Sequence, residues 1–171
     1  MLGRSLLLLG AAALASVTIA CSEGVPSSEP LDQDDLGIDE LVARASAGDW
    51  ETVDDLLGAL PEEQLASVVL LEQSGSLHRA DVAHPRMVFY GPDARLIVAV
   101  STLPADRRYE TVELMELDED TGAFRLAAIT FGDDGVAVEG DGRCTGCHGD
   151  EPRPIWGAYP SWPGAFGPLD G

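Results

Sequence analysis

The feature that most constrains the fold is a series of β-prone segments separated by turn sequences. These segments occupy residues 87–90, 95–102, 110–117, 124–131 and 135–139. Segment 110–117 alternates polar and apolar residues, as a strand with one buried face does. The sequences between most of them contain Gly, Pro and Asp, which favour tight turns. Short turns join strands that are neighbours in sequence, so the middle of the chain is predicted to form an antiparallel meander of four or five strands.

Helices are predicted before this meander. Residues 38–47 carry apolar residues at helical spacing, with acidic residues in the first turn. A second helix is expected over residues 50–60, with Asp49 as its N-cap. Pro61 is expected to open a third helix that continues to about residue 73. The predicted fold class is therefore α+β, with N-terminal helices followed by an antiparallel β meander.

The N-terminus has the pattern of a secretory signal peptide over residues 1–20. Arg4 supplies a positive charge, and residues 6–15 form an apolar run that is short for a membrane-spanning helix. Thr18, Ile19 and Ala20 lead into Cys21. The small residue just before the cysteine resembles the lipobox of bacterial lipoproteins, although Thr18 departs from the usual Leu. The resemblance implies that Cys21 receives a lipid and becomes the new N-terminus. Ordinary signal cleavage without lipidation is the alternative.

Residues 21–35 are predicted to be a disordered tether between a lipid anchor and the folded part. Ser, Pro, Glu and Asp dominate this stretch, so it offers little apolar surface to bury. The α+β domain is expected over residues 36–142, and residues 143–171 form a loop-rich C-terminal segment. The chain is therefore expected to be exported to the bacterial cell envelope and anchored to a membrane, facing the periplasm or the exterior.

The charge balance is strongly acidic. The chain has 30 acidic and 10 basic residues, every basic residue is Arg, and the formal net charge is −20. Such a surface repels nucleic acid and anionic lipid headgroups, so neither is an expected partner. A partner protein is expected to have a basic docking surface. The alternative interpretation is that the acidity serves only solubility.

The cysteines indicate the chemistry of the C-terminal segment. If Cys21 is lipidated, the remaining cysteines are Cys144 and Cys147, which His148 follows directly. Cys-x-x-Cys-His is the attachment signature of haem c. The two thiols add to the two vinyl groups of one porphyrin, and the histidine next to them becomes an axial ligand of the iron. Export supports this interpretation, because attachment takes place outside the bacterial cytoplasm.

Three other uses of the cysteine pair are compatible with its spacing. Cys144 and Cys147 could form a structural disulfide in an oxidising compartment. A thiol–disulfide redox pair is less favoured, because the motif lies near the end of the chain without a βαβ pattern. A zinc site would need four ligands, typically from two separated pairs. His78 and His84 do not stand at metal-ligand spacing.

The similarity extends beyond the motif. Residues 143–167 resemble a family of uncharacterised bacterial cytochrome c-like proteins, in which a Pro-Arg-Pro segment and a Trp-Pro-Gly run follow Cys-x-x-Cys-His. Residues 74–100 resemble a strand pair of the same family. The resemblance implies one covalent haem c and one-electron transfer. A conventional small cytochrome c builds helices after its motif, whereas only 23 residues follow His148 here (171 − 148 = 23). Either the haem packs on the upstream sheet and helices, or the chain is a shortened relative.

The second axial ligand is not fixed by the sequence. Candidates are Met87, Met115, His78 and His84, and none is preferred. His84 precedes a proline and is expected to be a loop residue. Met115 lies in an alternating strand, where methionine usually fills the core.

The tail after the motif suggests three supporting roles. Its aromatic residues are expected to cover the macrocycle, or simply to pack on the domain; they are Trp156, Tyr159, Trp162 and Phe166. Arg153 is expected either to pair with a haem propionate or to balance acidic neighbours on the surface. The carbonyl of Pro152 or Pro154 is expected to accept a hydrogen bond from His148.

Three functions are compatible with these observations. The favoured one is an envelope-tethered electron carrier with one haem c. The alternatives are a haem enzyme with an open distal site and a non-haem lipoprotein whose binding domain contains a Cys144–Cys147 disulfide.

Overall fold

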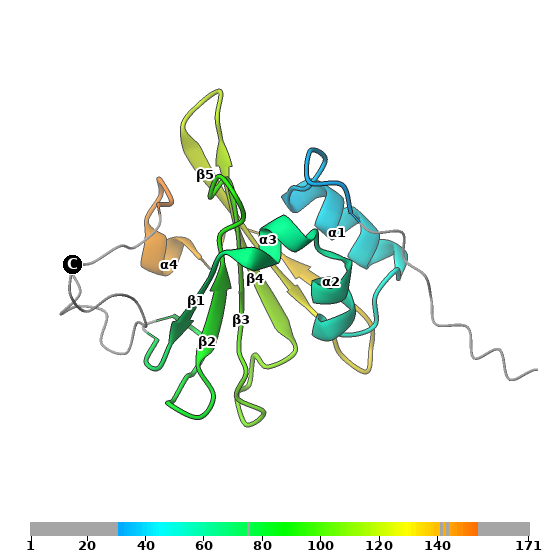
Figure 1. The fold of residues 1–171 in the computed structure, drawn as a ribbon, viewed down its shortest axis with the longest axis vertical. Coiled ribbons are helices and arrows are strands. Elements are labelled where there is room, and N and C mark those ends of the chain that lie inside the picture. Colours follow the sequence, from blue (N-terminus) through cyan, green and yellow to red (C-terminus); the bar gives the residue numbers. More distant parts are fainter. Residues whose placement is uncertain (1–30, 75, 141, 143, 154–171) are drawn as a thin grey trace, which may run out of the picture.

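The computed structural model describes residues 31–74, 76–140, 142 and 144–153 (Figure 1). Three helices come first, followed by strands that form one antiparallel sheet in sequence order, from β1 to β6. This arrangement confirms the predicted α+β class and the antiparallel meander. The elements are α1 (Ile38–Ala47), α2 (Val53–Ala59), α3 (Glu62–Ala66), β1 (Val68–Leu71), β2 (Arg86–Phe89), β3 (Leu96–Val100), β4 (Thr111–Asp118), β5 (Ala123–Thr130), β6 (Ala137–Glu139) and α4 (Thr145–His148).

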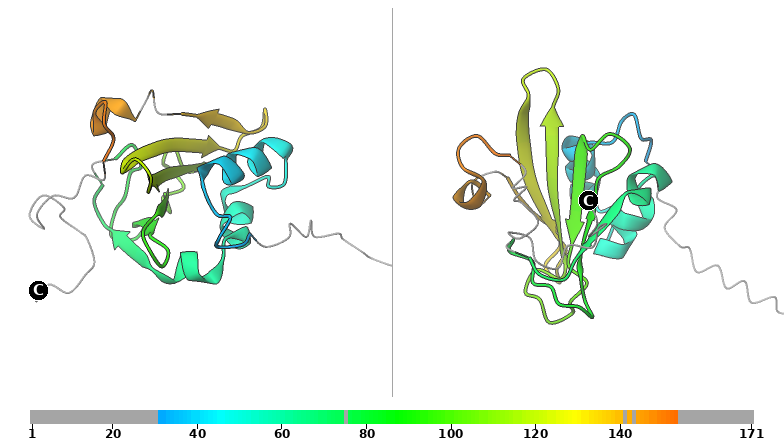
Figure 2. Two further views of the ribbon diagram at one scale, coloured as in Figure 1. Left: turned by 90° about the horizontal axis from the view of Figure 1, so that it is seen from above. Right: turned by 60° about the vertical axis from the view of Figure 1, so that its left-hand side comes forward.

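The sheet separates the helices into two groups. Helices α1 to α3 lie on one side of it, whereas α4 lies on the opposite side (Figures 1 and 2). The longest strand pair is β4–β5, which runs from Thr111 opposite Thr130 to Asp118 opposite Ala123. Along β4, Val112 and Leu114 face the helices, while Glu113 and Met115 face the other way. We call these two sides the helical face and the outer face.

The main core lies between the helices and the helical face. Helix α1 packs on β4, β5 and β6, and α3 packs on β2. Trp50 is buried in this core, and the guanidinium carbon of Arg44 lies 5.1 Å from the centroid of its ring. The side chains that are fully or almost fully buried here include Leu36, Leu41, Leu56, Leu96, Val98, Val112 and Ile129.

Helix α1 receives its N-terminal cap from the sheet. Gly37, at the N-cap position, has no side chain to bind the free backbone groups, and the Glu116 carboxylate of β4 accepts the Ile38 N–H at 3.1 Å. The negative charge also suits the positive end of the helix dipole. At the other end, Gly48 has φ +83°, the left-handed conformation that commonly ends a helix.

Helix α2 begins later than predicted. Asp49 is not its N-cap, because its carboxylate is ion-paired with Arg44 at 2.7 Å. Thr52 takes that position instead: its hydroxyl accepts the Asp55 N–H at 3.1 Å, and the Asp55 carboxylate accepts the Thr52 N–H at 3.0 Å. This reciprocal capping box satisfies two backbone donors at once.

The third helix is shorter than predicted. It ends at Ala66, and residues 68–71, expected to be helical, form the edge strand β1. Val69 and Leu71 of β1 pack into the apolar cluster of the outer face. Pairing with β2 therefore decides the structure of this apolar run, whose length and composition fit either element.

Packing of the domain begins at Leu31, inside the stretch predicted as a tether. Leu31 is buried, and its N–H donates to the Ala59 carbonyl at 3.1 Å. Residues 1–30, which include the predicted signal peptide and Cys21, lie outside the described part. Within the described ranges, no helix combines the length and apolarity needed to cross a bilayer.

Candidate functional site

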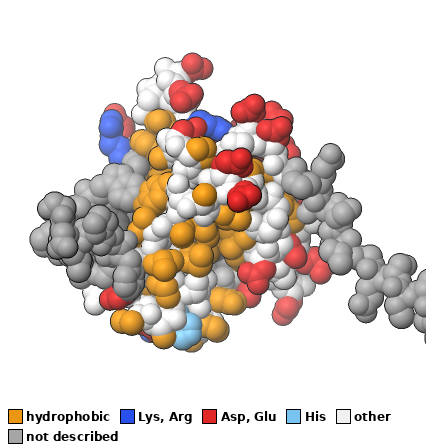
Figure 3. Space-filling model, in the orientation of Figure 1, with side chains coloured by type: hydrophobic (Ala, Val, Ile, Leu, Met, Phe, Trp, Pro, Cys, Tyr) orange, Lys and Arg blue, Asp and Glu red, His pale blue; other side chains and the backbone are white. Residues whose placement is uncertain are grey.

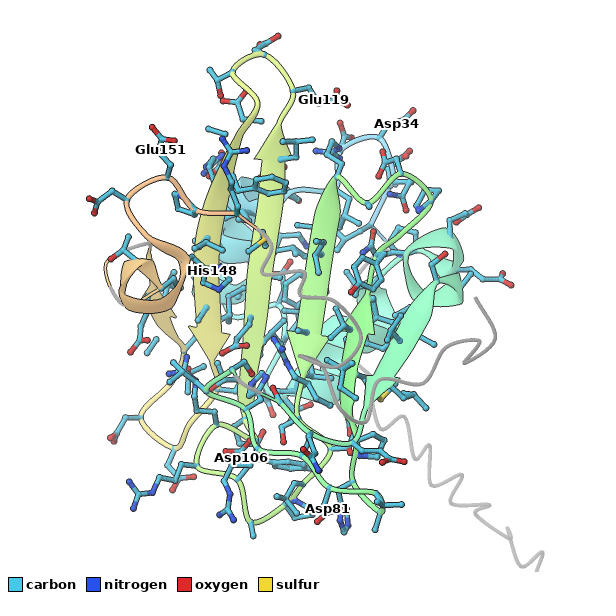
Figure 4. All side chains as sticks on the ribbon, turned by 90° about the vertical axis from the view of Figure 1, so that its left-hand side faces the viewer. Asp34, Asp81, Asp106, Glu119, His148 and Glu151 are labelled. Atoms are coloured by element: carbon cyan, nitrogen blue, oxygen red, sulfur yellow. The ribbon has the colours of Figure 1, made fainter. Side chains whose placement is uncertain are left out.

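The outer face of the sheet carries a second apolar cluster. Its buried members are Leu71, Val88, Ile97, Ala99, Met115 and Leu126, and we call it the outer-face cluster. Val69, Tyr90, Phe124 and Cys144 pack against it. Tyr90 is half-buried on this face, and burial raises its pKa to about 12. Figure 4 is a direct view of this face.

The cysteine motif forms a single helical turn beside this cluster. The His148 N–H donates to the Cys144 carbonyl, and the Gly149 N–H donates to the Thr145 carbonyl, both at 2.9 Å. Gly149 then has φ +79°, which ends the turn. Positions 144, 147 and 148 are related as i, i+3 and i+4. The backbone thus brings the three predicted attachment residues into a single helical turn.

Cys144 links this turn to the sheet. It is half-buried and packs against the outer-face cluster, which includes Met115. The Thr145 hydroxyl donates to the Gly142 carbonyl at 3.3 Å and braces the start of the turn. A porphyrin bonded to Cys144 would therefore be next to an apolar surface rather than in open water.

The side chain of His148 is oriented by the segment that follows it. Its Nδ1 lies 2.8 Å from the backbone carbonyl oxygen of Arg153. A carbonyl only accepts, so Nδ1 carries the proton and the lone pair of the neutral ring is on Nε2. The predicted carbonyl contact is therefore present, but Arg153 makes it rather than either flanking proline. Figure 4 shows His148 in front of the sheet.

The Arg153 side chain points away from this contact. It is 71% exposed, and its Nη2 is 4.0 Å from a carboxylate oxygen of Glu151. This geometry fits the surface interpretation of Arg153. The four aromatic residues of the predicted hydrophobic cover lie outside the described residues.

The four candidates for a second axial ligand differ in their position relative to the outer face. Met87 packs against the core on the helical face, away from Cys144. His84 is half-exposed in a turn, where its Nδ1 contacts the Asp81 carboxylate at 3.2 Å. Met115 belongs to the outer-face cluster, and His78 contacts Glu113 on the same face. Two candidates, Met115 and His78, therefore remain on the side where Cys144 packs.

A polar group beside the outer-face cluster was not found by sequence reasoning. Its centre is the Glu113 carboxylate, which accepts from Arg86 Nη2 at 2.8 Å and lies 3.8 Å from Arg108 Nε. His78 Nδ1 is 3.3 Å from the same carboxylate. Burial lowers the pKa of both Arg86 and His78, and the negative charge of Glu113 opposes this shift. The members are brought together only by strand pairing and a long loop, so no sequence spacing indicates the group.

The described residues contain no set of three or more His, Cys, Asp and Glu side chains arranged to hold a bare metal ion. Haem iron does not need such a set, because the macrocycle supplies four of its ligands. The protein has to provide only axial donors and covalent attachment points.

Comparisons with known proteins do not add an identification. No family model, no curated protein and no solved structure matches the chain. The resemblance to cytochrome c-like proteins therefore stays a prediction from the motif and its flanking residues, and the function has to be inferred from the site itself.

Proposed function

We propose that this chain carries one haem c, bonded through thioethers to Cys144 and Cys147, with His148 Nε2 as an axial ligand of the iron. Its function is one-electron transfer in the bacterial cell envelope. The bound group supplies the exchange between Fe(III) and Fe(II). The chain supplies attachment, orientation and a poorly hydrated environment.

The contact between His148 and the Arg153 carbonyl carries this proposal. An imidazole that ligates a metal generally donates its other ring N–H to a carbonyl or carboxylate, which fixes both the tautomer and the ring direction. His148 has this arrangement, with Nδ1 donating at 2.8 Å. The sequence motif alone does not require this contact. It is therefore independent support for a ligand role of Nε2.

The outer-face cluster supports the same function. The surface beside Cys144 is apolar, as a porphyrin face requires, and it excludes water from one side of the macrocycle. Limited solvent access tunes the potential of a redox centre. The buried members of this cluster are aliphatic side chains and one methionine, none of which transfers protons. This composition favours an electron carrier over a haem enzyme with an open distal site.

The charge distribution supports docking to a basic partner protein. Several arginines are already paired within the domain, including Arg44 with Asp49, Arg86 with Glu113 and Arg95 with Glu116. Acidic side chains therefore dominate the described surface, and Figure 3 shows many of them on the side of the helices. A basic partner would be steered to this surface at low ionic strength.

Mass spectrometry of the mature protein tests the proposal directly. The protein is produced in a bacterium that exports it and matures c-type cytochromes. We expect a mass increase of one porphyrin with its iron, and haem that stays with the polypeptide in denaturing electrophoresis. The same spectrum reports acylation of Cys21.

Two variants provide the matched comparison. Cys144→Ser combined with Cys147→Ser is expected to abolish covalent haem, whereas His84→Asn, on an exposed turn, is expected to keep it. A colourless wild-type protein, lighter than the reduced chain by two hydrogens, would overturn the proposal and favour the disulfide-containing binding domain. Rapid carbon monoxide binding by the reduced protein would favour the haem enzyme.

A further inference from the structure

His78 is a buried imidazole without hydrogen-bonding partners. Its side chain is 0% exposed, and neither ring nitrogen has a hydrogen bond among the described residues. Nδ1 lies within ion-pair distance of Glu113, at 3.3 Å, but without hydrogen-bond alignment. Buried polar atoms almost always have a partner, so two unsatisfied nitrogens on one ring need an explanation.

The position of His78 relates it to the attachment site. Glu113, which it contacts, is on the outer face of β4 and stands two residues before Met115. Two residues along a strand span about 7 Å, which is less than the width of a porphyrin. Met115 belongs to the cluster on which Cys144 packs. A macrocycle attached at Cys144 and lying on this face would therefore extend toward the imidazole.

The backbone around His78 is fixed to the sheet. The N–H of the next residue, Arg79, donates to the Asp106 carboxylate at 2.7 Å, and the Ser101 hydroxyl donates to the Arg79 carbonyl at 3.3 Å. On the other side, the His78 N–H donates to the Ser76 hydroxyl at 3.1 Å. These contacts hold in place the backbone that carries the imidazole before any ligand binds, which favours binding.

Met115, the other candidate for the second axial ligand, already packs within the outer-face cluster. A methionine within an apolar cluster is satisfied by packing and needs no further partner. The His78 imidazole is buried beside Glu113, and neither of its ring nitrogens has a hydrogen bond among the described residues. Of the two candidates on the outer face, His78 therefore has ring nitrogens that need a partner, whereas Met115 has no such need.

We propose that His78 is the second axial ligand of the haem iron, coordinating through Nε2 on the side opposite His148. This inference rests on the proposed haem attachment. Glu113 would hold Nδ1, in the carboxylate–histidine–metal arrangement common in metal sites. Burial lowers the pKa of His78, which favours the neutral ring that a metal ligand requires.

Two histidine ligands would give the chain a definite redox character. Histidine in place of methionine lowers the reduction potential, and an iron with both axial positions filled does not bind small molecules readily. The inference thus predicts a low-potential electron carrier rather than an oxygen- or peroxide-reactive haem.

The test uses the mature, haem-loaded protein and three variants: His78→Ala, His78→Gln and Met115→Leu. Covalent haem is measured first by mass, so failure of attachment is separated from failure of ligation. Electron paramagnetic resonance then reports the spin state of the ferric iron, and far-UV circular dichroism confirms folding. We expect low-spin wild-type and Met115→Leu proteins with two-imidazole spectra.

Both His78 variants are expected to keep their haem, lose the low-spin signal and bind carbon monoxide rapidly when reduced. If His78→Ala does not fold, His78→Gln provides the same test. Added imidazole is expected to restore the low-spin signal in both His78 variants. Haem-loaded wild-type protein that is high-spin, or loss of the low-spin signal in Met115→Leu alone, would overturn the role of His78 while leaving haem attachment intact.

Discussion

Substitution of Glu113 tests whether the polar group on the outer face stabilises the fold. Its carboxylate accepts from Arg86 at 2.8 Å, and the two side chains are only 20% and 13% exposed. Glu113→Gln keeps an acceptor but removes the charge, leaving a buried guanidinium without a counter-ion. Glu113→Ala removes the acceptor as well.

The size of the effect follows from this burial. Removing one partner of a fully buried ion pair costs about 3–5 kcal/mol. Because Glu113 keeps partial contact with water and glutamine can still accept, we expect Glu113→Gln to lower the free energy of unfolding by about 2 kcal/mol. We expect Glu113→Ala to lower it by about 3 kcal/mol. Adding Arg86→Met to Glu113→Gln should recover part of the loss, since no unpaired charge then remains.

Urea denaturation followed by circular dichroism measures these differences, provided that the slope with urea is unchanged. Glu119→Gln is the matched control, because Glu119 is exposed in the turn between β4 and β5 (Figure 4). It should change stability by less than about 0.5 kcal/mol. If Glu113→Gln costs no more than the control, the Arg86–Glu113 pair does not contribute as the geometry indicates.

Three further predictions concern the described domain. In the haem-free variant that combines Cys144→Ser with Cys147→Ser, the free energy of unfolding should fall as pH drops below 6.5. Burial lowers the pKa of His78, so the unfolded chain binds a proton that the native state excludes. Adding His78→Asn should make this pH dependence less steep, and equal slopes with and without His78→Asn would contradict the prediction. Glu116→Gln should cost about 1–2 kcal/mol in urea denaturation, because it removes a charge both from the N-terminus of α1 and from the ion pair with Arg95; no loss would mean that the charge of Glu116 stabilises neither. Gly91→Ala should cost about 1–3 kcal/mol, because its φ is +63° and a Cβ would meet the Gln64 amide. Gly58→Ala, in open space on α2, should instead stabilise by about 0.5–1 kcal/mol, and similar effects at both glycines would refute the argument.

Local sequence patterns predicted the elements that depend on neighbouring residues. The bounds of α1 match residues 38–47, and the five predicted strands correspond to β2 through β6. In these segments apolar periodicity and turn residues agree. The errors arise where a distant partner decides the outcome. Strand β1 forms because β2 is available for pairing, although residues 68–71 also continue a helical apolar pattern.

The candidate site divides in the same way. The spacing of Cys144, Cys147 and His148 predicted an attachment motif in a loop-rich segment, and the structure forms a single helical turn at the motif, closed by hydrogen bonds. The carbonyl that binds His148 was predicted one residue away from its true position at Arg153. Every residue after the motif has a backbone carbonyl, so the sequence predicts that one lies close to His148. Which of the adjacent carbonyls accepts the hydrogen bond depends on the path of the loop.

In the proposed haem site, covalent attachment depends on local contacts, whereas coordination of the iron by His78 depends on contacts between distant residues. Thioether attachment needs only the local turn that carries both cysteines, so it does not depend on the sheet. Coordination by His78 needs the loop after β1, the outer face of β4 and the contact with Glu113, which residues far apart in sequence provide. Denaturant should therefore displace His78 from the iron while the haem stays bonded to the chain. The reduction potential then depends on tertiary contacts that the attachment motif does not specify, and chains with the same motif can differ widely in potential.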